Sequence, residues 1–304
     1  MSTSPEISVS EELFAPLGTG VELCYQTFGD PSDDAVLLVM GLGGPMNWWD
    51  SGFCELLASK GFHVIRYDNR DTGRSTSMPG RVSRADVVRA FSGLRARAPY
   101  SLVDMAADGI GLLDHLGIES AHVAGISMGG MIVQTMAIHH PGRIRSVTSI
   151  MSTTGKKTVG WQHPSLFSRL LAKRPAERGE YLAQSVAMAQ LIGSPAYPEG
   201  HQKATRRAEE TWDRGLNGPG VLRHMMAVLT QPNRSRDLHS VRVPVLVVHG
   251  MNDKMVHVSG GRATSSSIPG SELLLIDGMG HDLPVELWET VTDGIRRTAH
   301  RATS

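Results

Sequence analysis

The stretch Gly125-Ile126-Ser127-Met128-Gly129 constrains the fold more than any other part of this chain. Residues 120–124 before it are short and mostly apolar, as in a buried strand, and the apolar residues after it fit a buried helix that stops at Pro141. A serine between a strand and a helix sits on a sharp, strained turn, where side chains two residues to either side would collide with both elements. We therefore expect Ser127 at the tip of a strand–turn–helix unit, although the pattern alone also fits an ordinary glycine-rich turn.

Strand-like and helix-like segments alternate along the chain, and this order predicts an α/β fold with a mostly parallel central sheet and helices on both faces. Residues 20–28 alternate like an antiparallel edge strand, whereas residues 35–40 form an apolar run typical of a strand buried on both faces. The remaining predicted strands are 62–67, 120–124, 147–151, 243–249 and 272–276, and the predicted helices include 102–116 and 283–298.

Residues 155–240 differ from the rest because they lack strand-like runs and are rich in Ala, Arg, Glu and Gln. We expect them to form a helical cap inserted into a core made of residues 1–154 and 241–304. The larger apolar side chains of the cap either line a substrate pocket or form a small core of the cap itself. These are Trp161, Phe167, Tyr181, Met188, Met225 and Met226, of which Trp161, Met188 and Met225 are our candidates for substrate binding.

The composition limits which kinds of binding partner and which cellular location we expect for this protein. Thirty basic and thirty acidic side chains leave no net charge, which argues against a nucleic-acid or anionic-membrane partner. No apolar run approaches the ~20 residues of a transmembrane helix, and the first residues lack the pattern of a signal peptide. The two cysteines, Cys24 and Cys54, are too few for a disulfide framework. We expect a cytoplasmic protein, and the sequence does not decide between a monomer and a homodimer.

A serine hydroxyl becomes a good nucleophile only when a base takes its proton and a third group orients that base. Asp253 follows the predicted strand 243–249 and His281 follows strand 272–276, so both lie at the edge of the sheet where such sites assemble. The alternative position for the acid, residues 151–155, holds no carboxylate. We expect Asp277 and Asp282 to be solvated turn residues, and we expect no catalytic role for the remaining histidines, which include His139, His140 and His249.

The oxyanion of a tetrahedral intermediate needs two fixed N–H donors. We expect one from the backbone of Met128, directly after Ser127, and the other from Leu42 in the loop Gly41-Leu42-Gly43-Gly44. A phosphate-binding loop is the rival interpretation of these glycines, but the Lys-Ser/Thr ending of a P-loop and the spacing of a dinucleotide fingerprint are both missing. No His-Glu-x-x-His or paired Cys-x-x-Cys pattern occurs, so we expect neither a metal nor a cofactor.

These motifs together resemble the α/β-hydrolase superfamily over nearly the whole chain. Residues 68–75 resemble the loop after its fourth strand, and residues 37–41, 63–68 and 279–284 resemble the branch that holds aclacinomycin methylesterase and related lipases and esterases. The resemblance implies a cofactor-free hydrolase of carboxylic esters with a helical cap, a small-molecule ester as its substrate and an acyl-enzyme intermediate. It also implies a role for each site residue: Ser127 as the nucleophile, His281 as the base, Asp253 as the acid, and the Leu42 and Met128 N–H groups as the oxyanion donors.

One departure from that family is visible, since its common His-Gly pair at the start of the oxyanion loop is Met40-Gly41 here. Other chemistry shares the same triad, namely carbon–carbon bond hydrolysis, lactone hydrolysis and cofactor-free perhydrolysis. A non-catalytic binder of a small ligand is a further alternative, because some proteins of this fold only bind.

Overall fold

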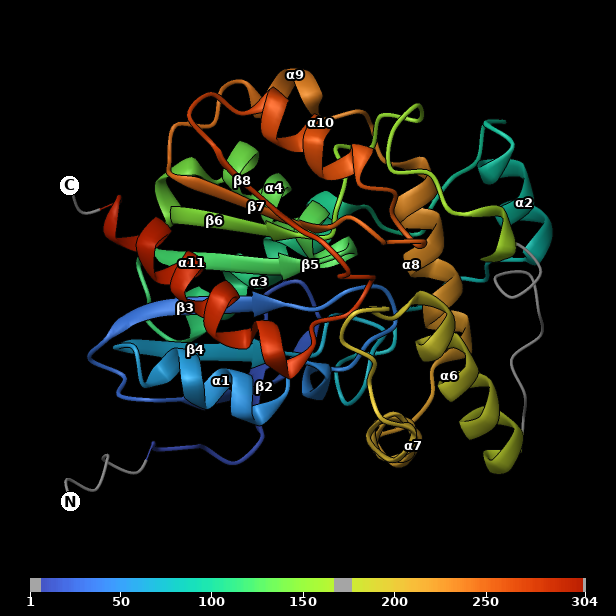
Figure 1. Ribbon diagram of the computed structural model, residues 1–304, viewed down its shortest axis with the longest axis horizontal. Helices are drawn as coiled ribbons and strands as arrows, with labels where there is room; N and C mark the ends of the chain where they lie inside the picture. The colour runs from blue at the N-terminus through green and yellow to red at the C-terminus, as the bar shows by residue number, and fades with distance from the viewer. Residues whose placement is uncertain (1–6, 167–176, 303–304) are drawn as a thin grey trace.

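A twisted eight-stranded sheet with helices on both faces makes up the core of the computed structural model, which describes residues 7–166 and 177–302 (Figure 1). The strand order is β1-β2-β4-β3-β5-β6-β7-β8, in which β1 and β2 run antiparallel to their neighbours and β4, β3 and β5 to β8 are parallel. The α/β fold and the mostly parallel sheet are therefore confirmed. The strands are β1 (Leu13–Pro16), β2 (Glu22–Phe28), β3 (Asp34–Val39), β4 (Phe62–Tyr67), β5 (Ala121–Ile126), β6 (Ile144–Ile150), β7 (Val245–Gly250) and β8 (Glu272–Ile276).

The predicted edge strand at residues 20–28 is not at the edge of the sheet. Strand β1 pairs outside β2, with Leu13 opposite Tyr25 and Pro16 opposite Glu22. This edge strand has only four residues, of which only Ala15 is buried, so it carries no alternation that sequence reasoning could detect. Its proline suits an edge position, where a missing backbone N–H breaks no ladder.

Strand β3 shows how a continuous apolar run divides between two cores. Leu37 and Val39 point into the cluster under α3 (Leu102–His115) and α4 (Met128–His139), whereas Val36 and Leu38 point into the cluster under α1 (Ser51–Ala58) and α11 (Trp288–His300). The short helices α9 (Ser235–Leu238) and α10 (Ser259–Ser267) cover the α4 side next to β7 and β8 (Figure 1). Burial on both faces holds the strands in register, and their carboxyl ends meet at one edge.

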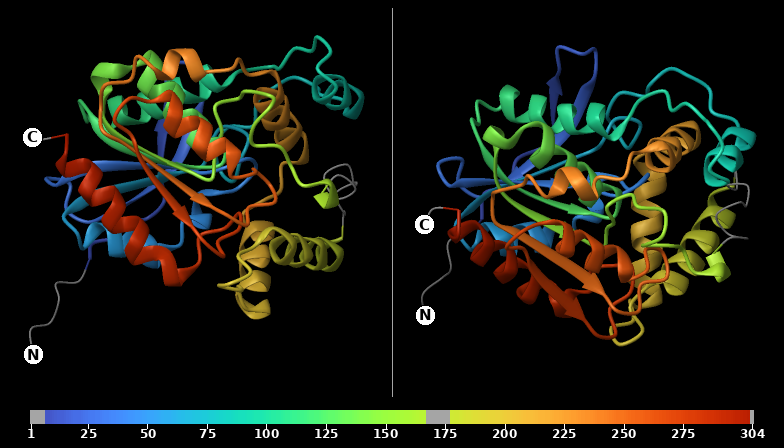
Figure 2. Two further views of the ribbon diagram at one scale, coloured as in Figure 1. Left: turned by 45° about the horizontal axis from the view of Figure 1, so that its top comes forward. Right: turned by 90° about the horizontal axis from the view of Figure 1, so that it is seen from above.

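Helices cover that edge. The described residues between β6 and β7 form the helices α6 (Arg178–Ile192), α7 (His201–Asp213) and α8 (Gly218–Thr230) before α9. A further helix, α2 (Arg84–Phe91), lies far from them in sequence but packs beside α8 (Figure 2) through the small apolar cluster of Val87, Ala90 and Met226. We call α2, α6, α7 and α8 the cap helices.

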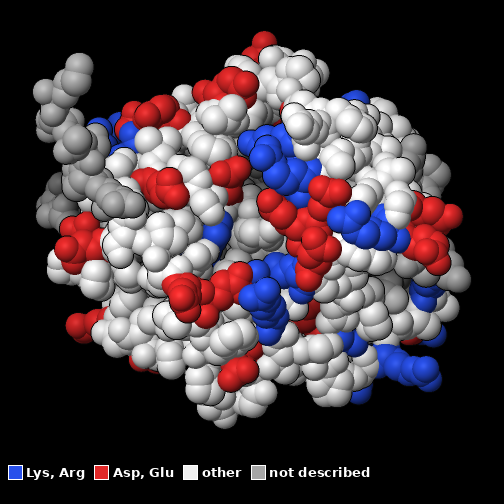
Figure 3. All heavy atoms as spheres, turned by 90° about the horizontal axis from the view of Figure 1, so that it is seen from below, with Lys and Arg blue, Asp and Glu red and all other residues white. Residues whose placement is uncertain are grey.

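The surface view from below shows Lys and Arg side chains next to Asp and Glu side chains, without a patch of one sign (Figure 3). Within residues 7–166 and 177–302, no helix combines the length and the apolar composition needed to cross a membrane.

Candidate active site

Ser127 lies on the turn between β5 and α4 that the sequence predicts. Its backbone has φ +57° and ψ −116°, a strained conformation for a residue with a side chain. Its N–H donates a 2.9 Å hydrogen bond to the Ile150 carbonyl oxygen at the end of β6. The turn is thus fixed to the neighbouring strand, and the partly exposed side chain of Ser127 stands at the carboxyl edge of the sheet.

The two glycines of the motif are required by close backbone contacts. A Cβ at Gly125 would lie 2.2 Å from the Gly129 carbonyl oxygen, and a Cβ at Gly129 would lie 2.0 Å from the Val39 carbonyl oxygen of β3. Real Cβ atoms do not approach backbone atoms so closely. These contacts bring the start of α4 against the sheet, as the motif predicts.

The structure brings the three predicted triad residues together from the ends of three strands. The Nε2 atom of His281, in the loop after β8, lies 3.1 Å from Ser127 Oγ. Its Nδ1 atom lies 2.7 Å from Oδ2 of Asp253, in the loop after β7. Because the carboxylate accepts, Nδ1 carries the proton and Nε2 is free to accept the Ser127 hydroxyl proton. This is the arrangement of a nucleophile, a general base and an orienting acid.

Asp253 is held in its charged form despite complete burial of its side chain. Burial alone raises the pKa of this carboxyl, but the charge of His281 and hydrogen bonds from His249 and His281 outweigh it and lower the pKa to about 2. The other oxygen, Oδ1, accepts the N–H groups of Met255 and Val256 at 2.8 Å each. His249, without an expected catalytic role, is buried with its Nε2 3.5 Å from Asp253 Oδ2 and thus contacts the acid.

The loop Gly41–Gly44 lies directly against Ser127. A Cβ at Gly41 would be 3.3 Å from Ser127 Cβ and 3.2 Å from the Ile126 carbonyl oxygen, which is tighter than most real Cβ contacts, so glycine suits this close approach. The Gly44 N–H donates to the Gly41 carbonyl oxygen at 3.3 Å, which closes a turn with Leu42 and Gly43 at its centre. Since the N–H and C=O of a trans peptide point in opposite directions, the Leu42 N–H points away from the interior of this turn.

Met128 is the first residue of α4, where backbone N–H groups have no partner within the helix. Among the described residues, neither the Met128 N–H nor the Leu42 N–H has a protein acceptor. Neither N–H is thus occupied by a described residue, and the role of the two groups as oxyanion donors stays a prediction. The unusual Met40 places its side chain in the core, and its carbonyl oxygen accepts a 3.0 Å hydrogen bond from Asn69 Nδ2.

The candidate substrate-binding residues lie in three different surroundings. Trp161 is half exposed, stacks on His257 at 4.2 Å and lines a cavity of about 170 Å³ next to the Asp253 loop. Met188 is a half-buried residue of α6, and Met225 packs against the cluster between α2 and α8. Phe167 lies outside the described residues. Their role in binding substrate stays a prediction.

The prediction that Asp282 is a solvated turn residue is wrong. Its Oδ1 accepts a short hydrogen bond from Ser194 Oγ, and burial raises the pKa of this carboxyl above its ordinary value. Ser194 also accepts the Gly280 N–H at 2.9 Å, and the Ala196 N–H donates to the Gly278 carbonyl oxygen at 3.2 Å. The loop that carries His281 is therefore bound to the segment after α6. No local sequence signal points to this contact, because it joins segments 86 residues apart.

In the described part of the chain, no group of three or more His, Cys, Asp or Glu side chains is placed to hold a metal ion.

The chain is similar to known proteins over nearly its whole length. A family model described as "alpha/beta hydrolase fold" matches residues 34–286. A rhodomycin D methylesterase of Streptomyces peucetius is 30% identical over 93% of this chain and 96% of its own length. A protein described as a putative carbamate hydrolase of Caulobacter sp. strain K31 is 29% identical over 88% of this chain and 92% of its own length. The crystal structure of the enol-lactonase from Burkholderia xenovorans LB400 superimposes with a TM-score of 0.75 at 21% identity, covering 95% of this chain and 100% of that chain.

Proposed function

The chain belongs to the α/β-hydrolase fold family, and we propose that within this family it is a serine hydrolase of carboxylic esters in which Ser127, His281 and Asp253 carry out the chemistry. The single observation that carries the proposal is the hydrogen-bonded chain from Ser127 Oγ through His281 to Asp253, with distances of 3.1 Å and 2.7 Å. The strained backbone of Ser127 supports it, because strain of this kind concentrates at functional sites.

The proposed reaction has two halves. In the first, Ser127 Oγ attacks the ester carbonyl carbon while His281 Nε2 takes the hydroxyl proton, and the C–O bond to the alcohol breaks as His281 returns that proton to the leaving oxygen. In the second, His281 takes a proton from water, the hydroxide attacks the acyl-enzyme, and the acid leaves as Ser127 regains its proton. Asp253 orients the imidazole and stabilises its cation throughout.

The Leu42 and Met128 N–H groups are the proposed donors to the oxyanion that forms in both halves. Two observations support this assignment: Gly41 lies close to Ser127, and Met128 is at the start of α4. The positive end of the helix dipole favours negative charge at this position. A single donor of this kind contributes about 3 to 4 kcal/mol to lowering the barrier.

Methyl esters are the substrate class that we propose first, because a methylesterase is among the relatives that cover nearly the whole chain. The proposal includes the cap of residues 155–240, with Trp161, Met188 and Met225 among the residues near the substrate. It also includes a cytoplasmic location, supported by the buried free thiols of Cys24 and Cys54, whose pKa values burial raises to about 12.

Hydrolysis of a series of p-nitrophenyl and methyl esters tests the proposal, together with labelling by a fluorophosphonate and location of the label by mass spectrometry. We expect the label on Ser127, and we expect Ser127→Ala and Asp253→Asn to lower kcat/KM by about 10⁴-fold or more. Ser266→Ala, at an exposed hydroxyl on α10, is the control and should leave turnover unchanged. Turnover that survives Ser127→Ala would refute the mechanism. Labelling of Ser127 without turnover of any ester would keep the nucleophile but refute ester hydrolysis.

A further inference from the structure

His224 of the cap helix α8 is completely buried and lies between two backbone groups of the core. Its Nδ1 lies 3.1 Å from the Gly43 nitrogen, and its Nε2 lies 2.8 Å from the Arg70 carbonyl oxygen. The first of these contacts joins residues 181 positions apart. The imidazole is thus a direct bridge from the cap to the loop that lies against Ser127.

The two partners determine the tautomer of the ring. A backbone N–H can only donate and a carbonyl oxygen can only accept, so Nδ1 of His224 accepts from Gly43 and Nε2–H donates to Arg70. Both contacts require a neutral imidazole. Burial lowers the pKa of His224 to about 4, although its hydrogen bond to the Arg70 carbonyl and the charge of Asp71 act in the opposite direction. The ring is therefore neutral, and the contact with Gly43 persists, near pH 7.

The contact with Gly43 fixes the orientation of the Leu42–Gly43 peptide, for which the described residues provide no other hydrogen bond. Leu42 and Gly43 are the central residues of the turn closed by the bond from Gly44 to Gly41. Rotation of the peptide between two central residues interconverts the common turn types, and Gly43, with φ +64°, tolerates both forms. An acceptor at Nδ1 favours the form in which the Gly43 N–H points to His224, because the rotated form would turn the Leu42 carbonyl oxygen toward the same nitrogen.

We propose that His224 is a positioning residue of the active site, which locks the turn around Leu42 and so couples the cap to the oxyanion-binding donor. The inference rests on the proposed function, in which the Leu42 N–H binds the oxyanion. The alternative is a ring that only fills space, as its edge-to-face contact with Tyr100 at 6.2 Å would suggest. A filler ring would need no acceptor toward Gly43.

Two variants separate the two hydrogen bonds of the ring. In His224→Asn the amide oxygen takes the position of Nδ1 and can accept from Gly43, while the donor to Arg70 is lost. In His224→Gln the terminal amide reaches the position of Nε2 and can donate to Arg70, while the acceptor for Gly43 is lost. We expect kcat for a p-nitrophenyl ester to stay within about 3-fold of wild type in His224→Asn and to fall about 10- to 100-fold in His224→Gln, with KM changed less than about 3-fold in both.

Asn217→Ala is the matched control because Asn217 caps the same helix and accepts the Gly220 N–H at 2.9 Å without touching the turn. It should lower the melting temperature and leave kcat near wild type. Equal losses of kcat in the Asn and Gln variants, or losses that follow the melting temperature across all three variants, would overturn the positioning role. A wild-type protein without ester turnover, or turnover that survives Ser127→Ala, would instead refute the proposed function, so the two failures are distinguishable.

Discussion

The backbone N–H of His281 donates a 2.7 Å hydrogen bond to the carbonyl oxygen of Ile192, the last residue of α6. Together with the hydrogen bonds of Ser194 to Gly280 and Asp282, this contact makes the His281 loop and the end of a cap helix one connected unit. The position of the imidazole relative to Ser127 therefore depends on a helix outside the central sheet.

Removal of the Ser194 hydroxyl should weaken this unit without touching the triad. In Ser194→Ala the Gly280 N–H loses its acceptor, and Asp282 loses a donor, so the already raised pKa of Asp282 should rise further. We expect kcat to fall about 3- to 30-fold, because small displacements of a catalytic group are costly in rate. Steady-state kinetics checks this result, with Ser266→Ala as the control. A variant with unchanged kcat would show that the contacts of Ile192 and Ala196 suffice.

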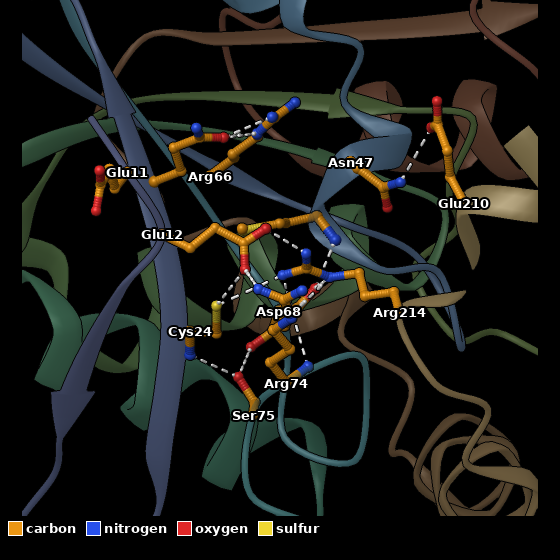
Figure 4. A network of polar contacts seen from close by, with 12 residues as sticks. Glu11, Glu12, Cys24, Asn47, Arg66, Asp68, Arg74, Ser75, Glu210 and Arg214 are labelled. Atoms are coloured by element: carbon orange, nitrogen blue, oxygen red, sulfur yellow. Dashed lines mark hydrogen bonds and ion pairs between the residues drawn. The ribbon is translucent and has the colours of Figure 1, made fainter. Parts of the chain in front are cut away.

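Arg214, directly after α7, forms a further connection between the cap helices and the core (Figure 4). Its guanidinium lies 2.6 Å from Oδ2 of the fully buried Asp68 and also contacts Glu12. Arg74 binds the same Glu12 at 2.7 Å, but its side chain is 54% exposed, against 7% for Arg214. We expect Arg214→Met to reduce the free energy of unfolding by about 3 to 5 kcal/mol, since it leaves a buried carboxylate without its cation.

The matched variant Arg74→Met should cost less than about 1 kcal/mol, because exposed ion pairs contribute little. Urea denaturation measures both. Because Asp68 also accepts the Met46 N–H at 2.7 Å, just after the oxyanion loop, Arg214→Met should lower kcat as well. Equal losses of stability in the two variants would contradict the claim that the buried ion pair of Arg214 contributes more than the exposed ion pair of Arg74.

Substitution by alanine should have opposite effects on stability at Gly129 and at Gly179. A Cβ at Gly129 would lie 2.0 Å from the Val39 carbonyl oxygen, whereas at Gly179 in α6 nothing lies within 4 Å. We expect Gly129→Ala to destabilise the fold by more than about 4 kcal/mol or to prevent folding. Gly179→Ala should raise the melting temperature, because alanine favours a helix by up to about 1 kcal/mol over glycine. Thermal unfolding followed by circular dichroism compares them, and a folded, active Gly129→Ala would contradict the close contact.

His122 should make the protein sensitive to acid. Burial, and secondarily the charge of Arg145, lowers the pKa of this imidazole to about 4 in the folded protein. The unfolded chain binds the proton at a pKa of about 6.5, so it holds more protons between these two values, and stability falls as the pH drops from about 6.5 to about 4. The contribution is on the order of 3 kcal/mol.

His122→Gln should therefore flatten the pH dependence of the free energy of unfolding in this window. The substitution of the exposed His239 by Gln is the control and should leave the slope as in wild type. An unchanged slope in His122→Gln would mean that the ring is protonated in the folded protein.

The local part of the site follows from the sequence because its signals are local. The elbow at Ser127 is specified by glycines two residues away, and Asp253 and His281 follow apolar runs that become β7 and β8. Parallel strands bring such loops to one edge, so strand pattern and chain order suffice to bring the three residues together.

The contacts between the cap helices and the core could not be predicted from local sequence signals. His224 contacts Gly43 across 181 residues, and nothing near either residue indicates the pairing. Helix α2 lies far from α8 in sequence and has the charged Arg84, Asp86 and Arg89 among its residues, and it packs on α8 through apolar side chains that include Val87 and Ala90. Strand β1 is missed for a related reason, since its pairing with β2 leaves just one of its residues buried.

The hydrogen bond that the Gly43 N–H donates to His224 has a consequence for how such enzymes diversify. A cap that only selected substrates could be exchanged between relatives as a module, with its recipient's chemistry left intact. Here an exchanged segment would bring its own residue to the position of His224 and its own carbonyl to the position of Ile192, and the recipient's loops would have to match both. We therefore expect new substrate specificity to arise more easily by single substitutions between Ile192 and His224 than by exchange of the whole segment.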